Sequence, residues 1–162
     1  MPIRPKQPPR AQLALGTFVK LSRATDSVSR GLAPGLAAAG LTESQFGVLE
    51  ALLHLGPLHQ CDLAERILKS NGNMTTVIGN LERRRLVRRD PSPTDRRFRE
   101  VRLTTAGERL VREVFAGHAE RLADLMSALT ETEQRTLGRL CRKLGLAARG
   151  AGLARPEGNL PG

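Results

Sequence analysis

The spacing of apolar residues predicts a chain that is mainly α-helical. From Leu13 onwards, apolar side chains recur every three or four positions and predict a first helix over residues 11–31. The same spacing predicts two shorter helices over Asp62–Leu68 and Asn71–Arg85, with a tight polar turn at residues 70–72. Two short helices joined by such a turn form a candidate helix-turn-helix.

Three threonines mark further helix starts. Thr42, Thr105 and Thr130 are each followed, three residues later, by Gln or Glu. In such a capping box the Thr oxygen accepts a hydrogen bond from a backbone N–H of the first helical turn, and the longer side chain bonds back to the Thr backbone. Apolar residues at helical spacing follow each box, so helices are predicted to begin at these three points.

After Leu86 the pattern changes from helical to alternating. Val87–Arg89 and Arg99–Leu103 alternate as strands do, and Asp90–Asp95 between them has the Pro, Ser and Asp residues typical of turns. The sequence therefore predicts a β-hairpin, or wing, after the candidate helix-turn-helix. The expected fold class is mainly α with a small β-hairpin wing.

Arginine is concentrated around this predicted wing. The formal net charge of the chain is +10, and residues 83–102 hold nine arginines against three acidic residues. Such a charge implies a polyanionic partner, with nucleic acid favoured over an anionic membrane surface. No apolar run approaches the roughly 18 residues that span a bilayer, so we expect a soluble protein without a membrane partner. An ordinary solvated face, the alternative, would mix Lys and Glu rather than concentrate arginine.

The second helix of the candidate helix-turn-helix begins with small polar residues. Asn73, Thr75 and Thr76 lie in its first turns, where a recognition helix places side chains against base edges in the major groove of DNA. The same residue types also favour helix starts, so a purely structural role is the alternative. Binding to RNA is disfavoured because only 2% of the residues are aromatic, which leaves no stacking platform for bases.

The segment SNGNMTTVIGNLERRRLVRRDPSPTDRRFREVRLTTAG resembles the signature region of the MarR family of winged helix-turn-helix transcriptional regulators. The resemblance covers roughly residues 11–147, and its most distinctive piece is Asp95-Arg96-Arg97 followed by Val101–Thr104. It implies a homodimer in which the N- and C-terminal helices interlock and two wings meet successive grooves of a palindromic operator. Double-stranded DNA and a second copy of the chain are thus the expected partners.

The resemblance also implies roles for single residues. Asp95 would pair with a nearby Arg and brace the wing, and Arg97 would enter the minor groove. Arg85 departs from the family, which often has Gly there to end the recognition helix in a left-handed conformation, so Arg85 is expected either to strain this turn or to change the helix end. The predicted DNA-contacting residues are Ser70, Asn73, Thr75, Thr76, Asn80, Arg83, Arg84, Arg96, Arg97 and Arg99.

The expected organisation has one domain between two tails. Residues 1–10, rich in Pro and basic side chains, predict a disordered basic arm, and residues 148–162 a disordered tail. The DNA-binding unit is expected over about residues 42–104. The dimerisation helices are expected over about 11–31 and 105–147.

These features favour a sequence-specific regulator of transcription, more often a repressor because a dimer on a promoter blocks polymerase. A non-specific architectural DNA-binding protein is the alternative. No HExxH, GxSxG or P-loop motif is present, so an enzyme is not expected, and neither is a cofactor or a metal. The first ten residues lack the apolar stretch of a secretory signal, which favours the cytoplasm.

The resemblance also implies that a small-molecule effector releases DNA from a crevice between the dimer helices and the DNA-binding unit. In this chain the crevice would be lined mainly by Leu, Val and Ala, with His54 or an Arg as its polar anchor. Redox sensing is disfavoured because Cys61 and Cys141 lie away from the first helix, where the family places its sensing cysteine, and no Tyr is present to support a reactive thiolate. Both cysteines are predicted to be buried as small apolar residues. A zinc site would need His54, Cys61, His59 and His118 to converge, and surface histidines are the simpler expectation.

Overall fold

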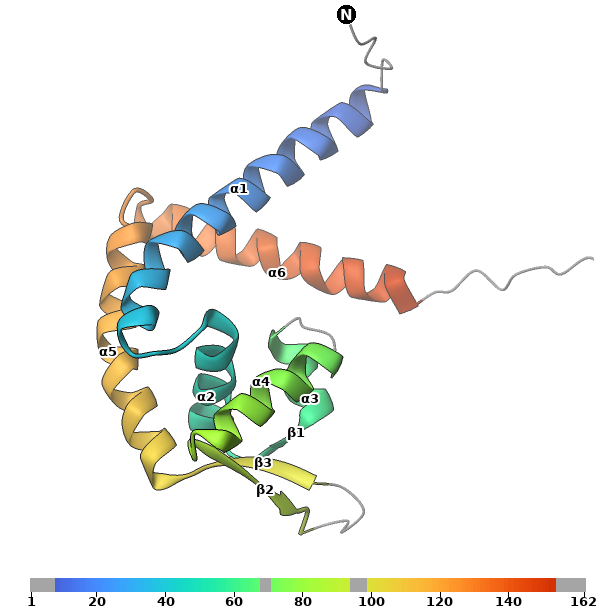
Figure 1. The fold of residues 1–162 in the computed structure, drawn as a ribbon. Helices are drawn as coiled ribbons and strands as arrows, with labels where there is room; N and C mark the ends of the chain where they lie inside the picture. Colours follow the sequence, from blue (N-terminus) through green and yellow to red (C-terminus); the bar gives the residue numbers. More distant parts are fainter. Residues whose placement is uncertain (1–7, 68–70, 94–98, 154–162) are drawn as a thin grey trace, which may run out of the picture. The chain divides into compact units, whose positions relative to one another are not determined.

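The computed structural model describes residues 8–67, 71–93 and 99–153. The chain divides into two units, Met1–Leu122 and Ala123–Gly162. Figure 1 shows the helices and strands in chain order. They are α1 (Pro9–Ala38), α2 (Glu43–Leu55), β1 (Leu58–His59), α3 (Gln60–Ile67), α4 (Asn71–Arg83), β2 (Val87–Pro91), β3 (Arg99–Leu103), α5 (Thr105–Met126) and α6 (Glu131–Leu153).

The predicted helix-turn-helix and wing are confirmed. Helices α3 and α4 are the two short helices, and β2 and β3 form an antiparallel hairpin in which Val87 pairs with Leu103 and Pro91 with Arg99. The short strand β1 pairs with the other edge of β3 and was not predicted, because two residues are too few to show an alternating pattern. The result is a mainly helical fold with a three-stranded sheet.

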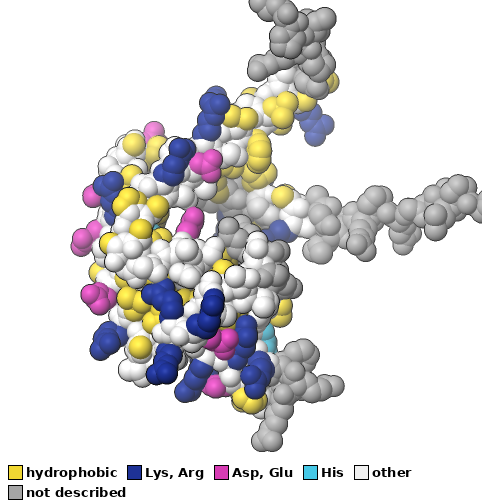
Figure 2. Space-filling view, in the orientation of Figure 1, with side chains coloured by type: hydrophobic (Ala, Val, Ile, Leu, Met, Phe, Trp, Pro, Cys, Tyr) yellow, Lys and Arg dark blue, Asp and Glu magenta, His cyan; other side chains and the backbone are white. Residues whose placement is uncertain are grey.

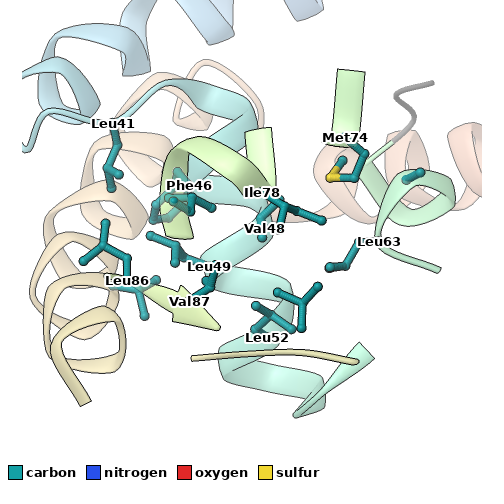
Figure 3. Packing of buried hydrophobic residues seen from close by; sticks show 14 of the residues in the cluster. Leu41, Phe46, Val48, Leu49, Leu52, Leu63, Met74, Ile78, Leu86 and Val87 are labelled. Atoms are coloured by element: carbon teal, nitrogen blue, oxygen red, sulfur yellow. The ribbon is translucent and has the colours of Figure 1, made fainter. Parts of the chain in front are cut away.

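One apolar core joins α2, α3 and α4 to the three-stranded sheet (Figure 3). Helices α2, α3 and α4 and strand β3 each contribute a side chain with no exposed surface: Leu49, Leu63, Ile78 and Val101. Burying a side chain of this size contributes on the order of 2 kcal/mol each, so the helix-turn-helix is held by its own core. This core fixes which face of α4 remains available to solvent.

Helix α1 runs from Pro9 to Ala38 and is longer than the predicted 11–31. Its start tolerates Pro9 because the first N–H groups of a helix have no partner within it. Its end passes Pro34 because the next turn is anchored: Leu36 is 3% exposed, and the Leu41 N–H donates to the Leu36 carbonyl across 2.9 Å. Similarly, α6 extends to Leu153, beyond the predicted end of the C-terminal helices at residue 147.

Two of the three predicted capping boxes are confirmed, and the third is replaced by a simple cap at the preceding residue, because Gly107 has no side chain to bond back. Thr42 and Thr130 each accept from the backbone N–H three residues later, and the Gln or Glu there accepts from the Thr backbone. Bonds from the Thr130 backbone and hydroxyl lower the pKa of Glu133 below its ordinary value. The prediction of Thr105 as a cap was wrong: Thr104 Oγ1 accepts from the Gly107 N–H, 3.0 Å away, because Thr104 is held at the end of β3.

Arg85 takes the left-handed backbone conformation, so of the two alternatives it strains the turn rather than changing the helix end. Its φ angle is 57°, and its N–H donates to the Glu82 carbonyl across 2.8 Å. The Leu86 N–H donates to the Leu81 carbonyl across 3.0 Å, which completes a Schellman-type helix end. A side chain with a Cβ is strained in this conformation.

Replacing Arg85 with Gly should therefore increase the free energy of unfolding by about 1 kcal/mol, since Gly adopts positive φ without steric cost. Urea denaturation followed by circular dichroism measures this change. Arg84→Gly is the matched control. It should destabilise the protein instead, because Arg84 precedes the left-handed position and its side chain donates to the Gly40 carbonyl. A loss of stability in Arg85→Gly would show that the turn is not strained.

The prediction that both cysteines are buried was wrong. Cys61 and Cys141 are exposed free thiols. Cys61 lies in the first turn of α3, and Cys141 lies on α6 near Leu140 and Leu144, which are 49% and 56% exposed. The prediction rested on the small apolar character of cysteine, which does not by itself place a side chain in the core. None of the described helices combines the length and the apolar character needed to span a membrane.

Candidate nucleic-acid interface

Helix α4 has one buried face and one exposed face. Met74, Ile78 and Leu81 have no exposed surface, whereas Asn73 and Thr76 are exposed. The exposed residues follow helical spacing, so they form a polar stripe along the side of α4 opposite the core. This is the surface that a recognition helix presents to base edges.

The stripe continues to the C-terminal end of α4. Asn80 is half-buried and Arg83 is exposed, and an Arg83 Nη2–H donates to Asn80 Oδ1. Arg84 instead reaches away from this stripe: its Nη1–H donates to the Gly40 carbonyl between α1 and α2, 2.6 Å away. The Arg84 side chain thus links the end of α4 to the loop between α1 and α2. Its predicted contact with DNA stays a prediction.

The outer face of the wing carries a network of ion pairs. Arg88 Nε lies 3.0 Å from Asp90 Oδ2, and Arg102 Nη2 lies 3.3 Å from Glu100 Oε2. Ser92, almost fully buried, donates to Glu100 Oε1 across 3.1 Å. The two ion pairs each lie within one strand, whereas the Ser92–Glu100 bond and a further pair, Arg102 Nε to Asp90 Oδ2 at 3.6 Å, connect the two sides of the described hairpin. Sequence reasoning had assigned bracing to Asp95 alone, although the cross-strand pairing of alternating residues could have indicated them.

The inner face of the wing is tied to α4. Arg89 Nη1 lies 3.0 Å from Glu82 Oε2, and Arg89 Nη2 donates to Gln60 Oε1 across 3.2 Å. Gln60 in turn donates to Thr75 Oγ1 across 2.8 Å. Sequence reasoning missed Gln60 and Glu82, because neither stands out from the pattern until the fold brings α3, α4 and β2 together.

Three of the predicted contact residues, Ser70, Arg96 and Arg97, lie outside the described residues, as does Asp95, the predicted brace of the wing. Arg99, the first residue of β3, is exposed, and its carbonyl oxygen lies 3.2 Å from His59 Nδ1. The structure therefore places Asn73, Thr75, Thr76, Asn80 and Arg83 together on α4 and Arg99 on the wing.

Positive charge gathers on this part of the molecule. In Figure 2 many Lys and Arg side chains lie over the lower part of the view, where Figure 1 places α4, β2 and β3. In this region Arg88, Arg89 and Arg102 are in ion pairs with carboxylates. Arg83, Arg85 and Arg99 are exposed, and so is Arg88 despite its ion pair. An exposed polar helix beside an arginine-rich hairpin can bind the phosphates and the grooves of a duplex.

Two histidines considered as zinc ligands pack against phenylalanine rings, one tilted and one edge-on. Ring centroids are 4.4 Å apart for Phe46 and His118, and 5.2 Å apart for His54 and Phe115. Over the part of the chain that the structure describes, no three His, Cys, Asp or Glu side chains gather in a group that could hold a metal ion.

The fold and this surface define a winged helix-turn-helix DNA-binding protein, and comparison with known proteins agrees. The MarR family model matches residues 39–97. The chain is 34% identical to the HTH-type transcriptional regulator MhqR of Bacillus subtilis over 84% of this chain and 94% of that protein. It is 33% identical to the HTH-type transcriptional repressor MdtR of the same organism, over 67% of this chain and 70% of that protein.

Solved structures show the same fold. BpsR of Bordetella bronchiseptica superimposes with a TM-score of 0.72 at 27% identity, covering 80% of this chain and 98% of that one. In BpsR, DNA binding is regulated by 6-hydroxynicotinic acid. The chain belongs to the MarR family and is a DNA-binding transcriptional regulator. Its relatives are regulators rather than enzymes.

Proposed function

We propose that this regulator is a homodimeric repressor that binds a palindromic operator in the cytoplasm. The observation that carries the proposal is the exposed polar face of α4, with Asn73 and Thr76 on it, beside a braced arginine-rich wing. A non-specific architectural protein needs basic charge but no base-reading face. The relative MdtR is a transcriptional repressor, which supports repression rather than activation by this chain.

Dimerisation is supported by large apolar side chains that the chain leaves exposed. On α1, Leu13 is 74% and Phe18 66% exposed, and Leu140 and Leu144 are exposed on α6. Monomeric soluble proteins rarely leave such apolar stripes uncovered on two helices, and a second copy would bury them about a two-fold axis. A two-fold dimer carries two copies of α4, which matches an inverted repeat in DNA.

In the proposed complex each residue has a distinct part. Asn73, Thr75 and Thr76 read base edges in the major groove. Arg97 at the wing enters the minor groove, and Asp95 braces it. The remaining proposed contacts, to phosphates and sugars, come from Ser70, Asn80, Arg83, Arg84, Arg96 and Arg99.

A small-molecule effector is the finer part of the proposal. BpsR is regulated by 6-hydroxynicotinic acid, which makes a small effector reasonable for this chain as well. The described structure has a surface hollow of about 250 Å³ with Leu52, Leu53 and Leu103 in its walls and Arg88 and Arg112 among its polar groups. His54, considered as a polar anchor, is not among its lining residues.

The test is selection of DNA from a random-sequence duplex library with the full-length protein. We expect enrichment of an inverted repeat whose half-sites are centred about one helical turn apart. Fluorescence-anisotropy titration of that duplex should show two chains bound per repeat and an affinity at least about a thousandfold above that for a random duplex.

Two results would contradict the proposal. Equal affinity for the enriched and random duplexes would favour the architectural alternative, and one chain bound per enriched site would remove the dimer. Asn73→Ala should reduce the preference for the repeat. Glu113→Ala, which changes an exposed residue of α5, should leave the preference intact.

A further inference from the structure

We propose that Gln60 is a positioning residue for sequence reading: it holds the Thr75 side chain in one orientation and links it to the wing. The inference rests on the proposed function, in which Thr75 on α4 contacts base edges. Gln60 itself was not among the predicted contacts. Its place at the first position of α3 puts it beside both α4 and β2.

The polar contacts form a continuous chain along one side of α4. Thr75 Oγ1 accepts from Gln60 Nε2 across 2.8 Å, and Gln60 Oε1 accepts from Arg89 Nη2 across 3.2 Å. Arg89 Nη1 then lies 3.0 Å from Glu82 Oε2. Thr75 and Glu82 are seven residues apart on α4 and therefore share one side of the helix. The chain of contacts begins and ends on α4 and passes through α3 and the wing.

Arg89 fixes the direction of these hydrogen bonds. A guanidinium group only donates, so the side-chain oxygen of Gln60 must face Arg89 and its NH2 group must face Thr75. Arg89 is itself held by Glu82, and their side chains are only 27% and 30% exposed. The Gln60 amide therefore has one favourable orientation, in which it donates to the Thr75 hydroxyl.

This bond selects a side-chain conformation on the reading surface. Thr in a helix divides between two χ1 rotamers, because its hydroxyl can also bond to the backbone of the preceding turn. The bond from Gln60 favours the rotamer in which Oγ1 faces α3, so the hydroxyl and the methyl group of Thr75 are presented in a fixed arrangement. A contact held in place before binding discriminates better between bases, since binding does not have to order it.

The experiment compares Gln60→Met with the parent protein. The probes are the inverted-repeat duplex enriched by selection and copies of it that each change one base pair symmetrically in both half-sites. Thr75→Val should lose discrimination at the base pair that Thr75 contacts. Gln60→Met, which removes both hydrogen bonds but keeps the side-chain length, should lose roughly fivefold in discrimination at that same base pair. In a Thr75→Val background, Gln60→Met should add nothing further at that base pair.

Gln134→Met is the matched control. Gln134 also uses its amide to hold the structure, donating to the Met126 and Leu129 carbonyls, but it lies in the other unit of the chain. This variant should keep the parent's discrimination at every base pair. A merely structural role for Gln60 would lower the unfolding midpoint and weaken binding to all duplexes in equal proportion.

Three results would overturn the inference. Gln60→Met could keep full discrimination, it could weaken all duplexes equally, or its effect could add to that of Thr75→Val. If the parent protein itself does not discriminate between the enriched duplex and its altered copies, the proposed function fails and the inference fails with it. Discrimination by the parent that Gln60→Met leaves intact would refute only the role of Gln60.

Discussion

Gly107→Ala should destabilise the protein by about 3 kcal/mol, although it replaces only one hydrogen atom with a methyl group. Gly107 is buried in the first turn of α5, against the backbone that follows α4. An added Cβ would overlap the Leu86 carbonyl oxygen and lie 2.8 Å from the carbonyl carbon. Because both atoms belong to backbone, no side chain can rotate to make room. Urea denaturation followed by circular dichroism measures the change.

Gly117→Ala is the control on the same helix. A Cβ built at Gly117 meets nothing within 4 Å, so the better helix propensity of Ala should raise stability by about 0.5 to 1 kcal/mol. The two substitutions are chemically identical and should have opposite signs. If Gly107→Ala were as stable as the parent, the close approach of α5 to Leu86 would be refuted.

Binding to the selected operator should weaken steeply with salt. If the proposed dimer contacts about 8 to 10 phosphates, the logarithm of affinity should fall with the logarithm of salt concentration with a slope of about −7 to −9. Exposed Arg83, Arg85 and Arg99, doubled in a dimer, are candidates for much of this contact, together with the wing arginines. Fluorescence anisotropy across a salt series measures the slope. A slope near −2 would mean that the arginine-rich surface does not meet the backbone of the duplex.

Arg99→Gln separates phosphate contact from overall charge. It should reduce the magnitude of the slope by about 2, because two contacts are lost in the dimer. Arg121→Gln removes the same charge from α5, where Arg121 donates to the Gly31 carbonyl of α1, and should leave the slope unchanged. Equal changes in both variants would show that net charge alone determines the salt dependence.

Local chemistry explains how much of the fold could be predicted. The boxes at Thr42 and Thr130 work within four consecutive residues, so the sequence contains all the information that they need. The wing is similar, because a strand alternates whatever it pairs with, and β2 and β3 lie where alternation indicated. The exposed positions of Asn73 and Thr76 follow from the helical spacing of the apolar residues of α4, which are Met74, Val77, Ile78 and Leu81.

The errors share a different cause, which is contact between distant parts of the chain. Thr104 becomes the cap of α5 because its hydroxyl also donates to the Arg85 carbonyl, 2.7 Å away. Gln60 gains its importance only where α3, α4 and β2 meet. The cysteines were misjudged because the apolar character of a residue does not show whether other parts of the chain cover it. The cap at Thr104, the contacts of Gln60 and the exposure of the cysteines all depend on how the chain folds, so local sequence patterns could not predict them.

The junction between α4, β3 and α5 leaves no room for a hinge. Thr104 bonds to both Arg85 and Gly107, and the backbone of Gly107 lies against Leu86, so the start of α5 cannot bend away from the DNA-reading helix without breaking these contacts. We therefore expect the start of α5 and the DNA-reading helix to move together. In the proposed dimer, the separation of the two reading helices would therefore be set by the tilt of α5, and an effector could misalign them with the grooves of DNA without touching either one.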